Sequence, residues 1–83
     1  MIQQVRELAE KYTHAQLEAC IDEHIRSGKN SCGVSGEAEE VMNILSKASY
    51  VRQMIEEGKA ENLTDAIRKL ALSMRNVQQQ GKR

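Results

Sequence analysis

Three side chains in the first half of this sequence have the types and spacing of metal ligands. Cys20 and His24 are four residues apart, so they lie on one face of the chain if this stretch is helical, and Cys32 follows them. Thiolate and imidazole groups are common zinc ligands, but structural zinc sites usually combine two close pairs. Because Cys20 and His24 form the single close pair, we expect no metal and no cofactor. The candidate ligand set, if a metal binds, is Cys20, His24 and Cys32.

Cys32 is also a candidate nucleophile. It lies just before Ser35, the predicted N-cap of a helix, and a helix N-terminus favours a thiolate. A cysteine enzyme additionally needs a base held by a third group and an oxyanion site. His24 is the nearest base, and nothing in the sequence orients it. The carboxylates of Glu37, Glu39 and Glu40 oppose a thiolate. We therefore expect no enzymatic activity, and a zinc-binding or thiol-dependent protein is a second alternative.

A phosphate-binding loop is excluded by the residues around Gly28 and Lys29. That motif requires an earlier glycine, where this chain has Glu23, and a Ser or Thr directly after the lysine, where it has Asn30.

The elements that position these residues follow from the composition. The chain has 83 residues, no proline and no Phe or Trp, and its formal net charge is zero. A chain of this length forms one domain with a small core, so a deep catalytic cleft is not expected. Apolar residues recur at spacings of three and four, and the glycines lie at or outside the ends of these periodic segments.

This pattern predicts an all-α fold, a small four-helix bundle or orthogonal helical array with short loops. The helices are expected at about 2–12, 14–27, 36–57 and 63–77, with the third the longest, in a single domain of residues 1–77. Residues 78–83 read as a polar, disordered tail.

Local signals support the second helix. Thr13 and Gln16 have the spacing of a capping box, and Gly28 is placed to end the helix. Its inward residues are predicted to be Leu17, Ile21 and Ile25.

Three of the apolar residues that fall outside the predicted core positions of the last two helices are candidate contact residues. The seam of the third helix consists of Val41, Ile44, Ala48, Val51 and Ile55. Tyr50 and Met54 lie off that seam, and Leu72 lies opposite the apolar stripe of the last helix. We predict that Tyr50, Met54 and Leu72 contact another protein chain, either a second copy in a dimer or an unidentified partner.

Residues 50–75, YVRQMIEEGKAENLTDAIRKLALSMR, resemble the helix pair of antitoxins of the ribbon-helix-helix class. The matching positions are Gly58, Thr64, Asp65, Ile67 and Arg68. The resemblance implies a DNA-binding regulator. That family carries a DNA-reading strand before the first of these helices, whereas residues 37–49 are predicted to be helical here, so we do not assign the chain to it.

The C-terminal charge also favours nucleic acid as the alternative partner. Residues 64–83 contain five basic side chains and one acidic one. Arg68, Lys69 and Arg75 are the residues expected to contact phosphates in that case. Because the rest of the chain is acidic, a protein partner is favoured.

The N-terminal residues are charged and periodic, without the apolar run of a signal peptide or membrane span. We expect a cytoplasmic protein in which Cys20 and Cys32 are reduced and no disulfide forms.

Overall fold

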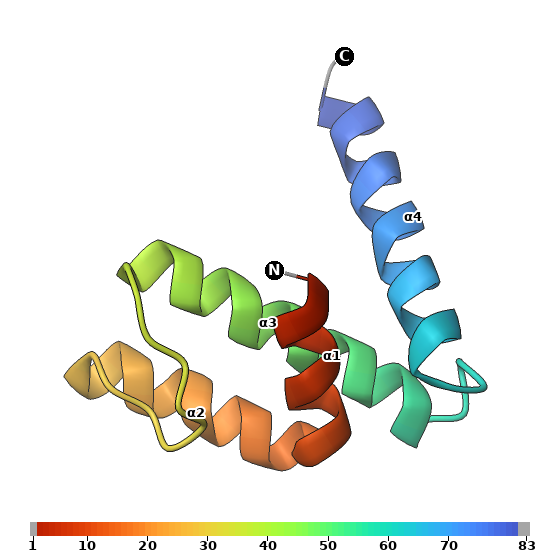
Figure 1. Ribbon diagram of the computed structural model, residues 1–83. Coiled ribbons are helices and arrows are strands. Elements are labelled where there is room, and N and C mark those ends of the chain that lie inside the picture. The colour runs from red at the N-terminus through yellow and green to blue at the C-terminus, as the bar shows by residue number, and fades with distance from the viewer. Residues whose placement is uncertain (1, 82–83) are drawn as a thin grey trace.

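Four α-helices make up the fold (Figure 1). The computed structural model describes the backbone of residues 2–81 and the side chains of residues 2–74. The helices are α1 (Ile2–Lys11), α2 (His14–Ser27), α3 (Ala38–Glu56) and α4 (Leu63–Gly81), and no strand occurs within the described range. The predicted all-α fold is confirmed, and α3, with 19 residues, is the longest helix, a length that α4 shares.

The helices cross one another rather than forming a parallel bundle. In Figure 1, α2 and α3 run side by side in opposite directions, α1 crosses them, and α4 rises steeply from the end of α3. The C-terminal half of α4 projects away from the other helices. The arrangement is therefore an array of crossing helices with one projecting arm.

The predicted start and end of α2 are confirmed. The Gln16 backbone N–H donates to Thr13 Oγ1 at 3.2 Å, and the Thr13 backbone N–H donates to Gln16 Oε1 at 2.9 Å, which completes the capping box. At the other end Gly28 has a φ of 76°, in the left-handed region, and its N–H donates to the His24 carbonyl. Only glycine adopts this conformation readily, so the helix stops there.

The predicted start of α3 is wrong by two residues. Ser35 is not the N-cap; that position is held by Glu37, without a side-chain cap hydrogen bond, and the helix begins at Ala38. Gly36 has a φ of 132°, which no helical residue can have, so the helix cannot begin before this turn. Glu39 and Glu40 then occupy the first turn, where the helix dipole favours negative charge.

The start of α4 agrees with the sequence, whereas its end does not. Asn62 Oδ1 accepts the Asp65 backbone N–H at 2.9 Å, as an N-cap residue does. The helix continues to Gly81, past the predicted end at residue 77. The last two residues of the predicted polar tail, 82 and 83, lie outside the described range.

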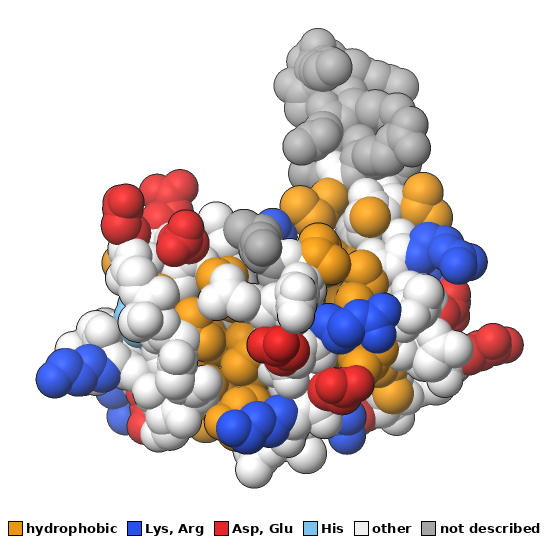
Figure 2. All heavy atoms as spheres, in the orientation of Figure 1, with side chains coloured by type: hydrophobic (Ala, Val, Ile, Leu, Met, Phe, Trp, Pro, Cys, Tyr) orange, Lys and Arg blue, Asp and Glu red, His pale blue; other side chains and the backbone are white. Residues whose placement is uncertain are grey.

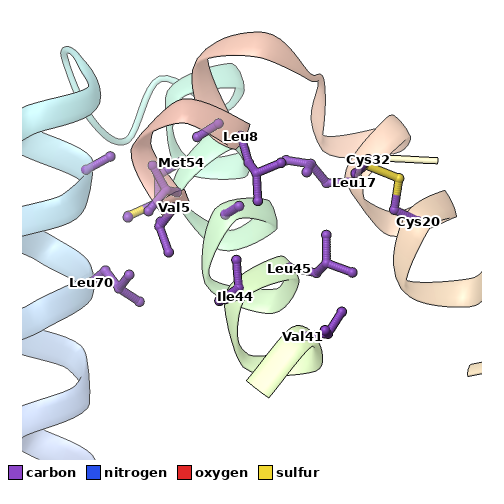
Figure 3. Packing of buried hydrophobic residues seen from close by; sticks show 14 of the residues in the cluster. Val5, Leu8, Leu17, Cys20, Cys32, Val41, Ile44, Leu45, Met54 and Leu70 are labelled. Atoms are coloured by element: carbon purple, nitrogen blue, oxygen red, sulfur yellow. A yellow bond between two sulfur atoms is a disulfide. The ribbon is translucent and has the colours of Figure 1, made fainter. Parts of the chain in front are cut away.

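The core is aliphatic and receives side chains from all four helices. The largest fully buried side chains are Leu17, Leu45, Val5, Val41 and Val51. Figure 3 shows Leu70 of α4 directed towards Val5 of α1 and Ile44 of α3. Burying each of these side chains contributes about 1.5–3 kcal/mol. The predicted α3 seam is confirmed for Val41, Ile44, Ala48 and Val51, and Ile55 is partly buried against the same cluster.

Two core predictions are wrong. Ile25 is 66% exposed, because the buried face of α2 runs through Leu17, Cys20 and His24. Met54, predicted to lie off the seam, is only 7% exposed, and Figure 3 shows its side chain beside Val5, facing α4. Both errors arise because the spacing of apolar residues does not specify which side of each helix its neighbours cover.

Among the described residues, no helix combines the length and the apolar character needed to cross a bilayer.

Candidate functional site

Cys20 and Cys32 are joined by a disulfide bond. Their Cα atoms are 6.1 Å apart, within the ordinary range for a bonded pair. The expectation of two reduced thiols and no disulfide is therefore wrong. The physical reason is the path of residues 28–37, which double back along α2 instead of leaving it (Figure 1). This path brings Cys32 against the side of the helix that carries Cys20.

The disulfide removes Cys20 and Cys32 from the set of three candidate metal ligands. Neither sulfur is a thiolate in this form, so neither is available to a metal or as a nucleophile. His24 is buried, with its Nδ1 atom 3.3 Å from Asn30 Nδ2. Within the described part of the chain, no three His, Cys, Asp or Glu side chains are grouped in a way that could hold a metal ion.

Hydrogen bonds add to the attachment of residues 28–37 to α2. The backbone N–H and the hydroxyl of Ser31 both donate to the Glu23 carboxylate, each at 2.9 Å. Asn30 folds the loop onto itself, since its side chain donates to the Val34 carbonyl and accepts the Val34 N–H. The loop is thus a structured connection.

These contacts lower the pKa of Glu23. The Ser31 backbone N–H, followed by the Ser31 hydroxyl, stabilises the carboxylate and holds the pKa of Glu23 below its usual range, while desolvation opposes the shift. Glu23 was not among the predicted site residues. The sequence offered only a weak signal for it, an acidic residue one turn from the end of a helix that precedes a serine-containing loop.

A second polar cluster, also missed from the sequence, joins α2 to α3. Ser49 is 3% exposed, and its hydroxyl donates to Glu18 Oε2 at 2.5 Å. Ser49 Oγ also lies 2.9 Å from His14 Nδ1, and this nitrogen is 3.2 Å from the Ser49 carbonyl oxygen. The spacing of His14 and Glu18, four residues apart on one helix face, was the available signal.

The His14, Glu18 and Ser49 cluster does not have the geometry of a serine hydrolase. In a catalytic triad the serine proton points to the histidine, whereas here it points to the carboxylate. Ser49 is also buried, which limits the access of a substrate to its hydroxyl. We interpret the cluster as a hydrogen-bond network that satisfies the hydroxyl of Ser49 within the helix interface.

Glu56 holds the first residue of α2 against the end of α3. Its carboxylate accepts the His14 backbone N–H at 2.9 Å and pairs with Arg52 Nε at 2.9 Å. The His14 N–H, and then the Arg52 side chain, place the pKa of Glu56 below its usual range. Arg52 also donates to the Ala9 carbonyl at 3.3 Å, so this group ties α1, α2 and α3 together.

The three predicted partner-contact residues lie in different environments. Met54 belongs to the core, so it offers no contact surface in this structure. Tyr50 is 39% exposed, and its hydroxyl is 3.3 Å from Ser73 Oγ on α4. Leu72 is 50% exposed and lies about 200° around α4 from the buried Leu70. Leu72 thus lies on the side of α4 opposite its core contact, whereas Tyr50 lies beside Ser73.

The predicted nucleic-acid contacts are only partly described. Arg68 and Lys69 are exposed on α4. Lys69 is engaged within the protein, since its Nζ atom lies 3.3 Å from Asp65 Oδ2 and donates to the Lys59 carbonyl at 2.6 Å. The side chain of Arg75 lies outside the described residues.

Comparison with known proteins does not assign a family to this arrangement. The chain matched no protein-family model, no curated protein and no solved structure.

Proposed function

We propose that this chain is a non-catalytic helical protein that acts by contact with another protein chain. The observation that carries the proposal is the apolar face of α4, which extends beyond the core. Along that face Ala66 and Leu70 are buried, whereas Met74, one turn further, is 39% exposed. Tyr50 of α3 adds exposed aromatic surface beside it through the Tyr50 and Ser73 contact.

The position of this face also supports the proposal. Figure 2 shows apolar side chains gathered where α4 leaves the other helices. Ile2, at the start of α1, is exposed as well. An isolated helix end is only marginally stable in water, because most helical stability comes from packing of an apolar face. A partner that covers Met74 would supply that packing.

A second copy of the chain is the partner we propose first. The segment 64–83 is basic, with five basic side chains against one acidic, whereas α3 begins with Glu39 and Glu40 directly after Glu37. In a two-fold dimer each copy offers both the acidic start and the basic end, so complementary charges can meet twice. Exposed Tyr and Met side chains suit such an interface.

Two matched variants test this proposal. Light scattering at about 100 µM, which populates a dimer of micromolar affinity, should give a mass above 9.4 kDa for the natural sequence. Met74→Lys should return the chain to the monomer, whereas Leu72→Lys, on the opposite face of the same helix, should leave the dimer intact. A monomer for the natural sequence would contradict self-association, and a loss of the dimer in Leu72→Lys alone would place the interface on the other face.

Nucleic acid is the competing partner. The exposed position of Arg68 favours it, whereas the engagement of Lys69 with Asp65 and the Lys59 carbonyl weighs against it. Retardation of random duplex DNA in about 50 mM salt separates the two partners, because phosphate contacts are strongest at low salt. Retardation that Arg68→Ala reduces would favour the nucleic-acid proposal over the protein proposal.

The cellular compartment of the protein follows from the disulfide as a further proposal. The sequence favoured the cytoplasm, but disulfides persist mainly in oxidising compartments. We propose that the chain spends part of its life in a compartment where the disulfide can close, so that the oxidised form accumulates there rather than the reduced form alone. Alkylation of free thiols at the moment of lysis, followed by mass measurement, distinguishes the two forms.

A further inference from the structure

The segment 30–34 fills the space between α1 and α2. Cys32 and Val34 border a surface hollow of about 200 Å³ together with α1 side chains that include Leu8 and Tyr12. On the α2 side the same segment is bonded through Cys32 to Cys20. Figure 3 shows the disulfide beside Leu17, with Leu8 on the neighbouring helix. We call residues 30–34 the plug, because they cover the apolar side chains of Leu8 and Leu17.

The disulfide joins a helix to the plug rather than one helix to another. Cys20 and Cys32 border the core cluster, but most of that cluster is built by other residues, such as Val5 of α1, Leu17 of α2 and Leu45 of α3. The Glu56 group also ties three helices together. Breaking the S–S bond would therefore release the plug while the helices stay packed.

The plug has few other attachments to the helices. Ser31 is bonded to Glu23, and both residues are exposed, so water competes for those hydrogen bonds. Asn30 Nδ2 lies 3.3 Å from His24 Nδ1 of α2, while the bonds of Asn30 to Val34 are internal to the plug. Gly33 and Gly36, both with positive φ, flank the apolar Val34 and give the segment backbone freedom.

Both cysteines line surface hollows from which a reductant can approach, although each residue is less than a tenth exposed. Cys32 borders the hollow described above, and Cys20 borders a second one of about 230 Å³ with Gln16, Glu23 and Ser31. Exchange begins when a thiolate attacks one sulfur of a disulfide, so this access is the chemical requirement.

We propose that the Cys20–Cys32 disulfide is a redox latch that holds the plug over Leu8 and Leu17. A dithiol reductant attacks one sulfur, the protein S–S bond breaks, and a mixed disulfide forms. The second thiol of the reductant then displaces the protein sulfur. Two electrons and two protons pass to the protein, Cys20 and Cys32 become thiols, and the reductant becomes a disulfide. The plug leaves its position and uncovers an apolar surface between α1 and α2. This latch is independent of the surface around Met74.

Hydrogen exchange with and without dithiothreitol tests the latch. On reduction the amides of residues 30–34 should exchange about tenfold faster or more, while α3 keeps its protection and the far-ultraviolet circular dichroism is unchanged. Binding of the apolar dye anilinonaphthalene sulfonate should rise, and reoxidation should reverse every change. The double variant Cys20→Ser with Cys32→Ser should behave as the reduced form with or without reductant.

Glu23→Gln in the oxidised protein is the matched control, because it weakens the hydrogen bonds to Ser31 and leaves the disulfide intact. Its plug should stay closed, without increased dye binding. The proposal is overturned by unchanged exchange in residues 30–34 on reduction. It is also overturned by loss of helicity, which would make the disulfide a support of the whole fold, or by a Glu23→Gln plug as open as the reduced one.

Discussion

Glu23 accepts two hydrogen bonds from Ser31, one from the backbone N–H and one from the hydroxyl, each at 2.9 Å. The two residues belong to different segments, the last turns of α2 and the loop that folds back along it. Because the donors stabilise the charged carboxylate, the contact depends on pH as well as on position.

We predict that acid loosens the loop at Ser31. The pKa of Glu23 is lowered in the folded protein from an ordinary value of 4.5, so its stabilising contribution is complete above that value and is lost as the pH falls through the folded pKa. Amide protection at Ser31, corrected for the intrinsic exchange rate at each pH, should therefore decrease below pH 4.5. The Glu23→Gln protein should lack this step. If the Glu23→Gln protein lost as much protection at Ser31, the loss would have to come from another carboxylate.

Leu17 and Ile25 should differ sharply in their tolerance of alanine, although they lie on one helix. Leu17 is fully buried, so Leu17→Ala should destabilise the fold by about 2–5 kcal/mol, since it removes apolar contacts and leaves a cavity. Ile25→Ala should change the free energy of unfolding by less than about 0.5 kcal/mol, because its side chain is largely exposed. Urea denaturation followed by circular dichroism measures both, and similar losses would contradict the observed burial.

Loss of the Thr13 hydroxyl should weaken the start of α2. Thr13→Ala removes the acceptor for the Gln16 N–H and should cost about 0.5–2 kcal/mol. Thr13→Ser retains the hydroxyl and should lie close to the natural protein. Thermal unfolding of the three proteins is the measurement, and equal stability of Thr13→Ala would show that water replaces the cap.

Gly28 should be sensitive to any β-carbon despite the open space around it. A Cβ built there meets no atom within 4 Å, so the cost of Gly28→Ala comes from its φ of 76° and should be about 1–2 kcal/mol. Gly28→Asn should cost less, because Asn tolerates the left-handed region better. If the two variants are equally stable in urea, backbone strain does not control this position.

Local sequence signals were sufficient to predict the helices and most of the core. The Thr13 and Gln16 capping box, Gly28 and the α3 seam act through neighbours within a few residues, so the sequence alone determined an all-α chain with four helices close to their observed bounds. The start of α3 was misplaced because the φ of Gly36 depends on the path of the whole loop.

Only the tertiary structure decided which distant residues meet. Cys20 and Cys32 pair because the loop doubles back along α2, and Met54 is buried because α4 and α1 close over it. Ser49 finds Glu18 across a helix interface, 31 residues away in sequence. Helix periodicity reports which face of each helix is apolar, but not which part of that face a neighbour covers. For this reason the disulfide and the exposed end of the α4 face emerged only from the packed fold.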